Sequence, residues 1–154
     1  MVDRTFYSED SGGSVKISGR ALAQAALGGF LTYAGVSHLT VARQEFQAQV
    51  PSWFPVDPDA VVLASGAVEI GLGAALLTAW HQPNRARVGL LAAAFFVAVF
   101  PGNIAQFTEH RDGFGLDTDT KRAVRLVFQP VLVGWALGAT RASRASRRRA
   151  EPKP

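Results

Sequence analysis

AVVLASGAVEIGLGAALLTAW, residues 60–80, decides the fold, because a single charged residue interrupts an otherwise uncharged and mostly apolar stretch. The hydrocarbon core of a bilayer is about 30 Å thick and a helix rises about 1.5 Å per residue, so about 20 mostly apolar residues are needed to cross it. The stretch is apolar on all faces rather than along one stripe, which is typical of a helix that faces lipid. It therefore predicts a membrane-spanning helix.

Three further stretches have the same character: residues 19–38, 88–107 and 122–140. They are rich in Gly and Ala, which allow spanning helices to pack closely where no hydrophobic effect draws them together. Charged residues make up 18% of the 154-residue chain and lie mostly between and outside these stretches. We therefore expect an all-α integral membrane protein, in which residues 18–140 form a bundle of four transmembrane helices. A soluble bundle with long core helices is the disfavoured alternative.

The two ends of the chain are polar. Residues 1–17 carry both signs of charge and lack a cleavage pattern, so they predict a cytoplasmic tail rather than a signal peptide. Residues 141–154 predict a basic cytoplasmic tail. Basic residues after a final span more often orient the protein and meet anionic lipid than bind nucleic acid, so no nucleic-acid partner is expected. The chain has no cysteine, which excludes disulfides and CxxC chemistry.

The distribution of positive charge predicts the orientation. The two tails and the 81–87 loop, counted with Arg20 at the start of the first span, carry eleven Lys and Arg residues, whereas the other two connections, counted with Arg122 and Arg125 at the start of the last span, carry five. Positive residues near span ends stay in the cytoplasm, so both termini are predicted to be cytoplasmic.

The first outer connection, near residues 39–59, contains the sequence VPSWFPVDPD at 50–59. Its three prolines prevent a regular helix. Trp53 and Phe54 are of the aromatic types that settle at the headgroup level of a bilayer. We expect an interfacial segment over the outer mouth of the bundle, either as a plain aromatic anchor or as a functional lid.

Glu69 lies about nine residues into the second predicted span. A carboxylate near the middle of a bilayer costs about 2.5–3.5 kcal/mol on insertion scales, so it must face the bundle and find a partner, or stay protonated. Gly66 and Gly73 stand at i−3 and i+4 from it, which places Glu69 in a groove of small residues where another helix can approach.

The other spans carry residues at helical spacings of three and four, which puts one polar face on each helix. These residues are Gln24, Gly28, Leu31, Gly35 and His38 in the first span, Val99, Asn103, Gln106 and His110 in the third, and Arg122, Arg125 and Gln129 in the fourth. Four-helix bundles bury such faces against one another.

The predicted orientation places six polar residues in the same outer half of the bundle and so predicts a polar cavity that opens outward. They are His38, Glu69, Asn103, Gln106, Arg125 and Gln129. Two interpretations stay open. The cluster is either a structural network with a Glu69–Arg125 salt bridge, or a site for a small molecule, a quinone or a proton. No metal-ligand or catalytic motif is found, so no metal site and no catalytic residue are predicted.

Five short blocks together resemble the DoxX-like family of small four-helix bacterial membrane proteins, over residues of about 34–137. They are AGVSH (34–38), VPSWFP (50–55), SGAVEIGLG (65–73), FPGNI (100–104) and RLVFQP (125–130) with Trp135. The resemblance implies a multi-pass protein of the bacterial inner membrane that is associated with membrane redox or stress physiology. It leaves the cofactor open, with a quinone as a candidate cofactor and a membrane redox protein as a candidate partner. Five of the six polar residues, all but Gln106, fall on the family's polar positions.

Two functions follow as hypotheses. The first is an accessory or quinone-adjacent subunit of a membrane oxidoreductase with an outward-facing polar cavity. The second is a non-enzymatic small-solute carrier, or an assembly partner in the membrane, with a purely structural polar network. Enzymatic activity, the ligand and the oligomeric state are left open by the sequence.

Overall fold

A computed structural model describes residues 18–141, and this part of the chain is built from α-helices without strands. The predicted all-α class is therefore confirmed. The predicted tails, residues 1–17 and 142–154, lie outside the described residues. The helices are α1 (Gly19–Leu39), α2 (Arg43–Gln47), α3 (Pro58–Thr78), α4 (Asn84–Thr108) and α5 (Asp119–Thr140).

Side-chain caps mark where three of the long helices begin. Ser18 accepts a hydrogen bond from the amide of Ala21 before α1, Asp57 caps α3 in the same way, and Thr118 caps α5. A short polar side chain at this position satisfies an amide that has no partner within the helix. Pro58 is tolerated at the start of α3, because the first turn of a helix does not use its amide as a donor.

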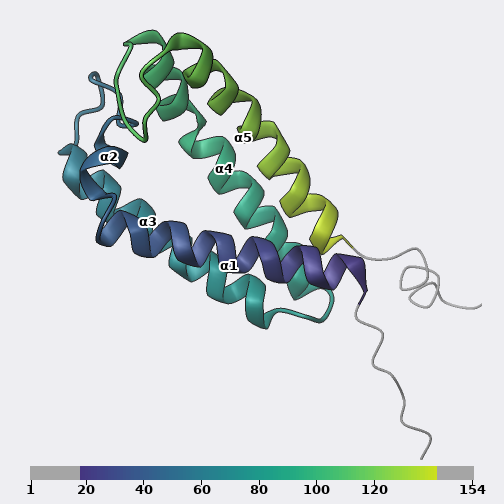
Figure 1. The fold of residues 1–154 in the computed structure, drawn as a ribbon. Helices are drawn as coiled ribbons and strands as arrows, with labels where there is room; N and C mark the ends of the chain where they lie inside the picture. Colours follow the sequence, from purple (N-terminus) through teal and green to yellow (C-terminus); the bar gives the residue numbers. More distant parts are fainter. Residues whose placement is uncertain (1–17, 142–154) are drawn as a thin grey trace, which may run out of the picture.

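The helices form two layers, α1 with α3 and α4 with α5, which cross obliquely (Figure 1). The layers contact mainly through α1 with α5 and α3 with α4, whereas α3 and α5 lie on a diagonal and make no contact. We call the end that carries α2 and the connection 109–118 the α2 end. The start of α1 and the end of α5 lie at the opposite end.

Two glycine pairs bring the backbones of α1 and α3 close together. A Cβ added at Gly35 would lie 2.6 Å from the carbonyl oxygen of Gly66, and one added at Gly73 would lie 2.7 Å from that of Gly28. Side chains at these positions would hold the helices apart, which explains the small residues predicted around Glu69.

The apolar core occupies the half of the bundle away from the α2 end. Residues of all four long helices meet there, and none of them is charged. They are Leu27, Leu31, Leu76, Ala92, Ala93, Phe96, Leu132 and Ala136. The half nearer α2 contains most of the buried polar side chains, among them His38, Glu69, Asn103, Gln106 and Gln129.

Three helices, α3, α4 and α5, are long and apolar enough to cross a membrane. Four spanning helices were predicted, and three of the four long helices have the length and the apolar composition of a membrane span. α1 has 21 residues, the same length as α3, but it includes Arg20, Gln24 and His38 and is less apolar.

Candidate functional site

His38 at the end of α1 lies directly against Glu69 of α3. The two residues are only 6% and 9% exposed, and His38 Nδ1 lies 3.0 Å from Glu69 Oε2. The same nitrogen lies 2.8 Å from the carbonyl oxygen of Ala34. One N–H cannot point well at two acceptors, and the Ala34 carbonyl receives it. Glu69 Oε2 is consequently at ion-pair distance from the imidazole but has no hydrogen-bond partner.

The short helix α2 covers this pair at the α2 end. The ring of Phe46 stacks on the imidazole of His38, with centroids 3.3 Å apart, and Phe114 of the 109–118 connection contacts Phe46 edge-on at 4.5 Å. The proline-rich connection was expected to be interfacial without a helix, so α2 was not predicted. Its single aromatic residue between polar neighbours, in RQEFQ, is the signal that could have indicated a buried contact.

Asn103, Arg125 and Gln129 form the opposite wall of the site. Gln129 Oε1 accepts hydrogen bonds from Asn103 Nδ2 at 3.1 Å and from Arg125 Nη1 at 3.3 Å. Its amide nitrogen donates to the carbonyl of Phe96. Gln129 is only 2% exposed and uses both ends of its side chain. It therefore links α5 to α4 by two contacts and orients Arg125.

The predicted Glu69–Arg125 ion pair is not formed, because no nitrogen of Arg125 lies within 4.0 Å of the Glu69 carboxylate and His38 occupies that place instead. The two residues stand on diagonal helices, which the sequence alone did not show. Within residues 18–141, the guanidinium of Arg125 hydrogen-bonds only to Gln129, so most of its N–H groups remain available.

Three buried polar atoms of the predicted site have no hydrogen-bond partner within the described part of the chain: Glu69 Oε2, Asn103 Oδ1 and Gln106 Nε2. Leaving a buried polar atom unpaired costs about 1–3 kcal/mol, and native proteins usually satisfy such atoms with water or a ligand. Two of the atoms accept and one donates. The site can therefore receive a small group that both donates and accepts hydrogen bonds.

Five of the six predicted site residues thus form two groups of contacts, His38 with Glu69 and Gln129 with Asn103 and Arg125, which together involve all four long helices. The sixth, Gln106, lies almost one turn beyond Asn103 on α4 and is 1% exposed. Its side-chain nitrogen lies beside Gly113 of the 109–118 connection.

An apolar hollow lies next to this wall. It has a volume of about 550 Å³ and opens on the outer face of the α4–α5 layer. The lining of the hollow is apolar except for Gln129, whose side chain can form hydrogen bonds. The lining residues are Val97, Phe100, Leu126, Val127, Gln129, Pro130 and Val133.

The two connections at the α2 end, before α3 and after α4, are tied to each other. Ser52 donates to the carboxylate of Glu109 through its hydroxyl at 3.1 Å, and Arg111 donates to the carbonyl of Val50. Val50 is buried, whereas Trp53 and Phe54 are exposed. This exposure fits either interpretation of the aromatic pair, as an anchor or as part of a lid.

Arg122 organises the 109–118 connection, a role that the sequence reasoning missed. It is only 5% exposed and donates to the carbonyls of His110 and Arg111 and to the carboxylates of Asp112 and Asp119. An arginine in the first turn of a helix that follows several aspartates was the available signal. At the exposed edge of the same connection, Lys121 donates to Asp117 and lowers the pKa of that carboxyl.

Among residues 18–141, no three His, Asp or Glu side chains gather in a way that could hold a metal ion. A family model described as a domain of unknown function, DUF8561, matches residues 27–140 and thus most of the four long helices. No curated protein and no solved structure matches the chain.

Proposed function

The chain belongs to the DUF8561 family, and we propose that it is a four-span membrane protein that binds the polar head of a membrane-soluble molecule between its two helix layers. We propose a quinone as this molecule. The protein then serves as an accessory, quinone-adjacent subunit of a membrane oxidoreductase in the bacterial inner membrane, as the resemblance to the DoxX-like family implies.

The packing of α1 supports a fourth span. α1 lies antiparallel to α3 over its whole length, with Gly28 against Gly73 and Gly35 against Gly66. Its polar residues Gln24 and His38 are buried, so they do not face lipid. Its exposed side chains are largely apolar, as a lipid-facing surface requires. They include Leu22, Phe30, Tyr33, Val36 and Leu39.

The charges at the two ends support cytoplasmic termini. The end away from α2 carries Arg20, Arg85, Arg87 and Arg141, and residues 18–30, 79–100 and 130–141 contain no Asp or Glu. The α2 end carries both signs of charge. An excess of arginine near span ends is typical of the cytoplasmic side. The polar site then lies in the outer half of the membrane.

The unpartnered polar atoms carry the ligand proposal. Arg125 and Gln106 offer N–H donors, which match the carbonyl oxygens of a quinone ring. Glu69 and Asn103 offer acceptors, which match the hydroxyl groups of the reduced ring. The apolar hollow of about 550 Å³ beside Gln129 suits the hydrocarbon tail and opens toward lipid.

Two measurements test this function. Mass spectrometry of the protein purified in mild detergent should find a co-purifying quinone. Titration with a short-chain ubiquinone should show saturable binding that Arg125→Gln weakens at least tenfold. Arg87→Gln, which removes an exposed arginine at the opposite end, serves as the matched control and should bind like the wild type. Equal binding by the wild type and Arg125→Gln would contradict the proposal.

A second function rests on the bonds of Gln129 to Asn103 and to the Phe96 carbonyl, which join α4 and α5 without any ligand. These bonds favour a small-solute carrier or a membrane assembly partner with a structural polar network. A solute-dependent proton flux in vesicles would favour the carrier. Quinone retention would favour the oxidoreductase subunit.

A further inference from the structure

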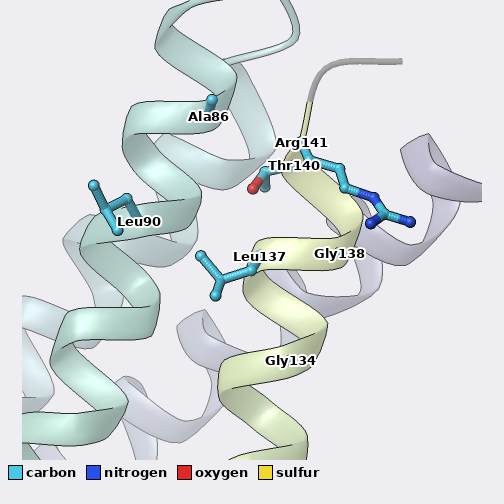
Figure 2. A pocket seen from close by; sticks show the side chains of 7 residues that line it. All are labelled: Ala86, Leu90, Gly134, Leu137, Gly138, Thr140 and Arg141. Carbon is cyan, nitrogen blue, oxygen red and sulfur yellow. The ribbon is translucent and has the colours of Figure 1, made fainter. Parts of the chain in front are cut away.

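The seam between α4 and α5 contains a second apolar hollow, at the end of the bundle where α5 ends (Figure 2). Its volume is about 460 Å³, within the range of about 300–1,000 Å³ that is usual for small-molecule sites. Ala86 and Leu90 of α4 form one wall, and Gly134, Leu137 and Gly138 of α5 form the other. A Cβ added at either glycine would meet no atom within 4 Å, so the space above them is open.

Within the part of the chain that the structure describes, the charged side chains next to this hollow are arginines. Arg141 belongs to the lining, and Arg87 follows Ala86 on α4. In Figure 2 the guanidinium of Arg141 extends along the end of α5, away from Leu90. Both arginines are exposed, and Arg87 donates one hydrogen bond, to the side chain of Asn84 at 3.3 Å, so most of their N–H groups remain available to a ligand. Arg85 adds a fixed positive charge, because it donates to the carbonyl of Ala139 at 2.8 Å.

We infer that this hollow binds one acyl chain of an anionic phospholipid, with the lipid phosphate held by Arg87 and Arg141. A guanidinium matches the phosphate oxygens with two parallel N–H donors. The acyl chain places the lipid in the hollow but does not distinguish one lipid from another, since lipids with the same acyl chains fill the hollow equally well. The negative charge of the headgroup therefore decides which lipid is selected.

A second copy of the chain is the alternative occupant, because Gly134 and Gly138 have the spacing at which spanning helices often pair. The charges disfavour it. Two copies inserted with the same orientation would bring Arg87 and Arg141 of each copy together at one end. No Asp or Glu in residues 79–100 or 130–141 is present to compensate for this repulsion.

The experiment compares phosphatidylglycerol with phosphatidylethanolamine of the same acyl chains, using the full chain in mild detergent. Native mass spectrometry counts the bound lipids, and thermal unfolding measures the stabilisation. The wild type should bind phosphatidylglycerol at least tenfold more tightly than phosphatidylethanolamine. Inorganic phosphate at millimolar concentration should not displace it, because the acyl chain contributes to binding.

Three variants locate the site. Gly138→Leu fills the hollow without an internal clash and should weaken phosphatidylglycerol binding at least tenfold. Gly71→Leu, on α3, also points its new side chain into open space and should bind like the wild type. The double variant Arg87→Gln/Arg141→Gln should lose the preference for phosphatidylglycerol.

Equal binding of the two lipids by the wild type would overturn the inference, as would unchanged phosphatidylglycerol binding in Gly138→Leu. Light scattering measures the oligomeric state of the wild type and of Gly138→Leu. If Gly138→Leu converts a dimer to a monomer while lipid binding is unaffected, the occupant of the hollow is a second copy and the lipid site is wrong.

Discussion

Replacing Gly35 by alanine tests the closest approach between α1 and α3. The new methyl carbon would lie 2.6 Å from the Gly66 carbonyl oxygen and 2.8 Å from Ile70 Cγ1. An ordinary carbon contact begins at about 3.4 Å, so the helices must separate locally by about 0.8 Å. Backbone atoms cannot rotate away as a flexible side chain would. We expect a loss of about 1–3 kcal/mol in the free energy of unfolding, as for other overpacked interiors.

Gly29→Ala is the matched control on the neighbouring position of the same helix. A Cβ at Gly29 meets no atom within 4 Å, so the substitution brings the higher helix propensity of alanine without a clash. Thermal unfolding in detergent, followed by tryptophan fluorescence, should place Gly35→Ala below the wild type and Gly29→Ala at or above it. The separation should also weaken quinone binding in Gly35→Ala, because His38 and Glu69 lie on the two displaced helices. Equal stability of the two variants would refute the reasoning.

Other predictions concern the charged residues and the orientation. Because Glu69 does not pair with Arg125, the stability losses of Glu69→Gln and Arg125→Gln should add in the double mutant; partial recovery would indicate an ion pair after all. Arg122→Gln should lower the free energy of unfolding by about 1–3 kcal/mol, since the hydrogen bonds of a buried guanidinium to the 109–118 connection are lost, and hydrogen exchange should show this connection opening; unchanged exchange would count against it. Single cysteines at Ser52 and Asn84 should react with an impermeant maleimide from outside at Ser52 only; labelling at Asn84 would reverse the orientation.

Helical periodicity was sufficient to predict the buried faces of α1 and α3, whereas His110, which was assigned to the polar face of the third span, lies past the end of α4 and is exposed. The predicted face of α1, from Gln24 to His38, is buried, and so are Gly66, Glu69 and Gly73 on α3. These positions could be predicted because a helix repeats every 3.6 residues, so residues at this spacing share one face. A polar residue on an apolar helix is costly in lipid and therefore faces the interior of the bundle.

The partners of these side chains could not be predicted in the same way. Periodicity assigns a residue to a face but does not say which helices are neighbours, so Glu69 was paired with the diagonal Arg125 rather than with His38. The stacking of Phe46 on His38 depends on a turn of helix between two irregular segments. Such short elements are stabilised by tertiary contacts rather than by their own sequence.

The polar residues of α1 and α3 affect how these two helices insert into the bilayer during synthesis. α1 emerges before α3 and carries Arg20, Gln24 and His38, while α3 carries Glu69, so each helix alone presents polar groups that lipid does not solvate. The glycine pairs allow the two helices to meet as a hairpin in which Gln24 donates to the carbonyls of Leu76 and Ala79 and His38 faces Glu69. We expect α1 to remain at the insertion machinery until α3 arrives, and the two helices to enter the bilayer as one unit.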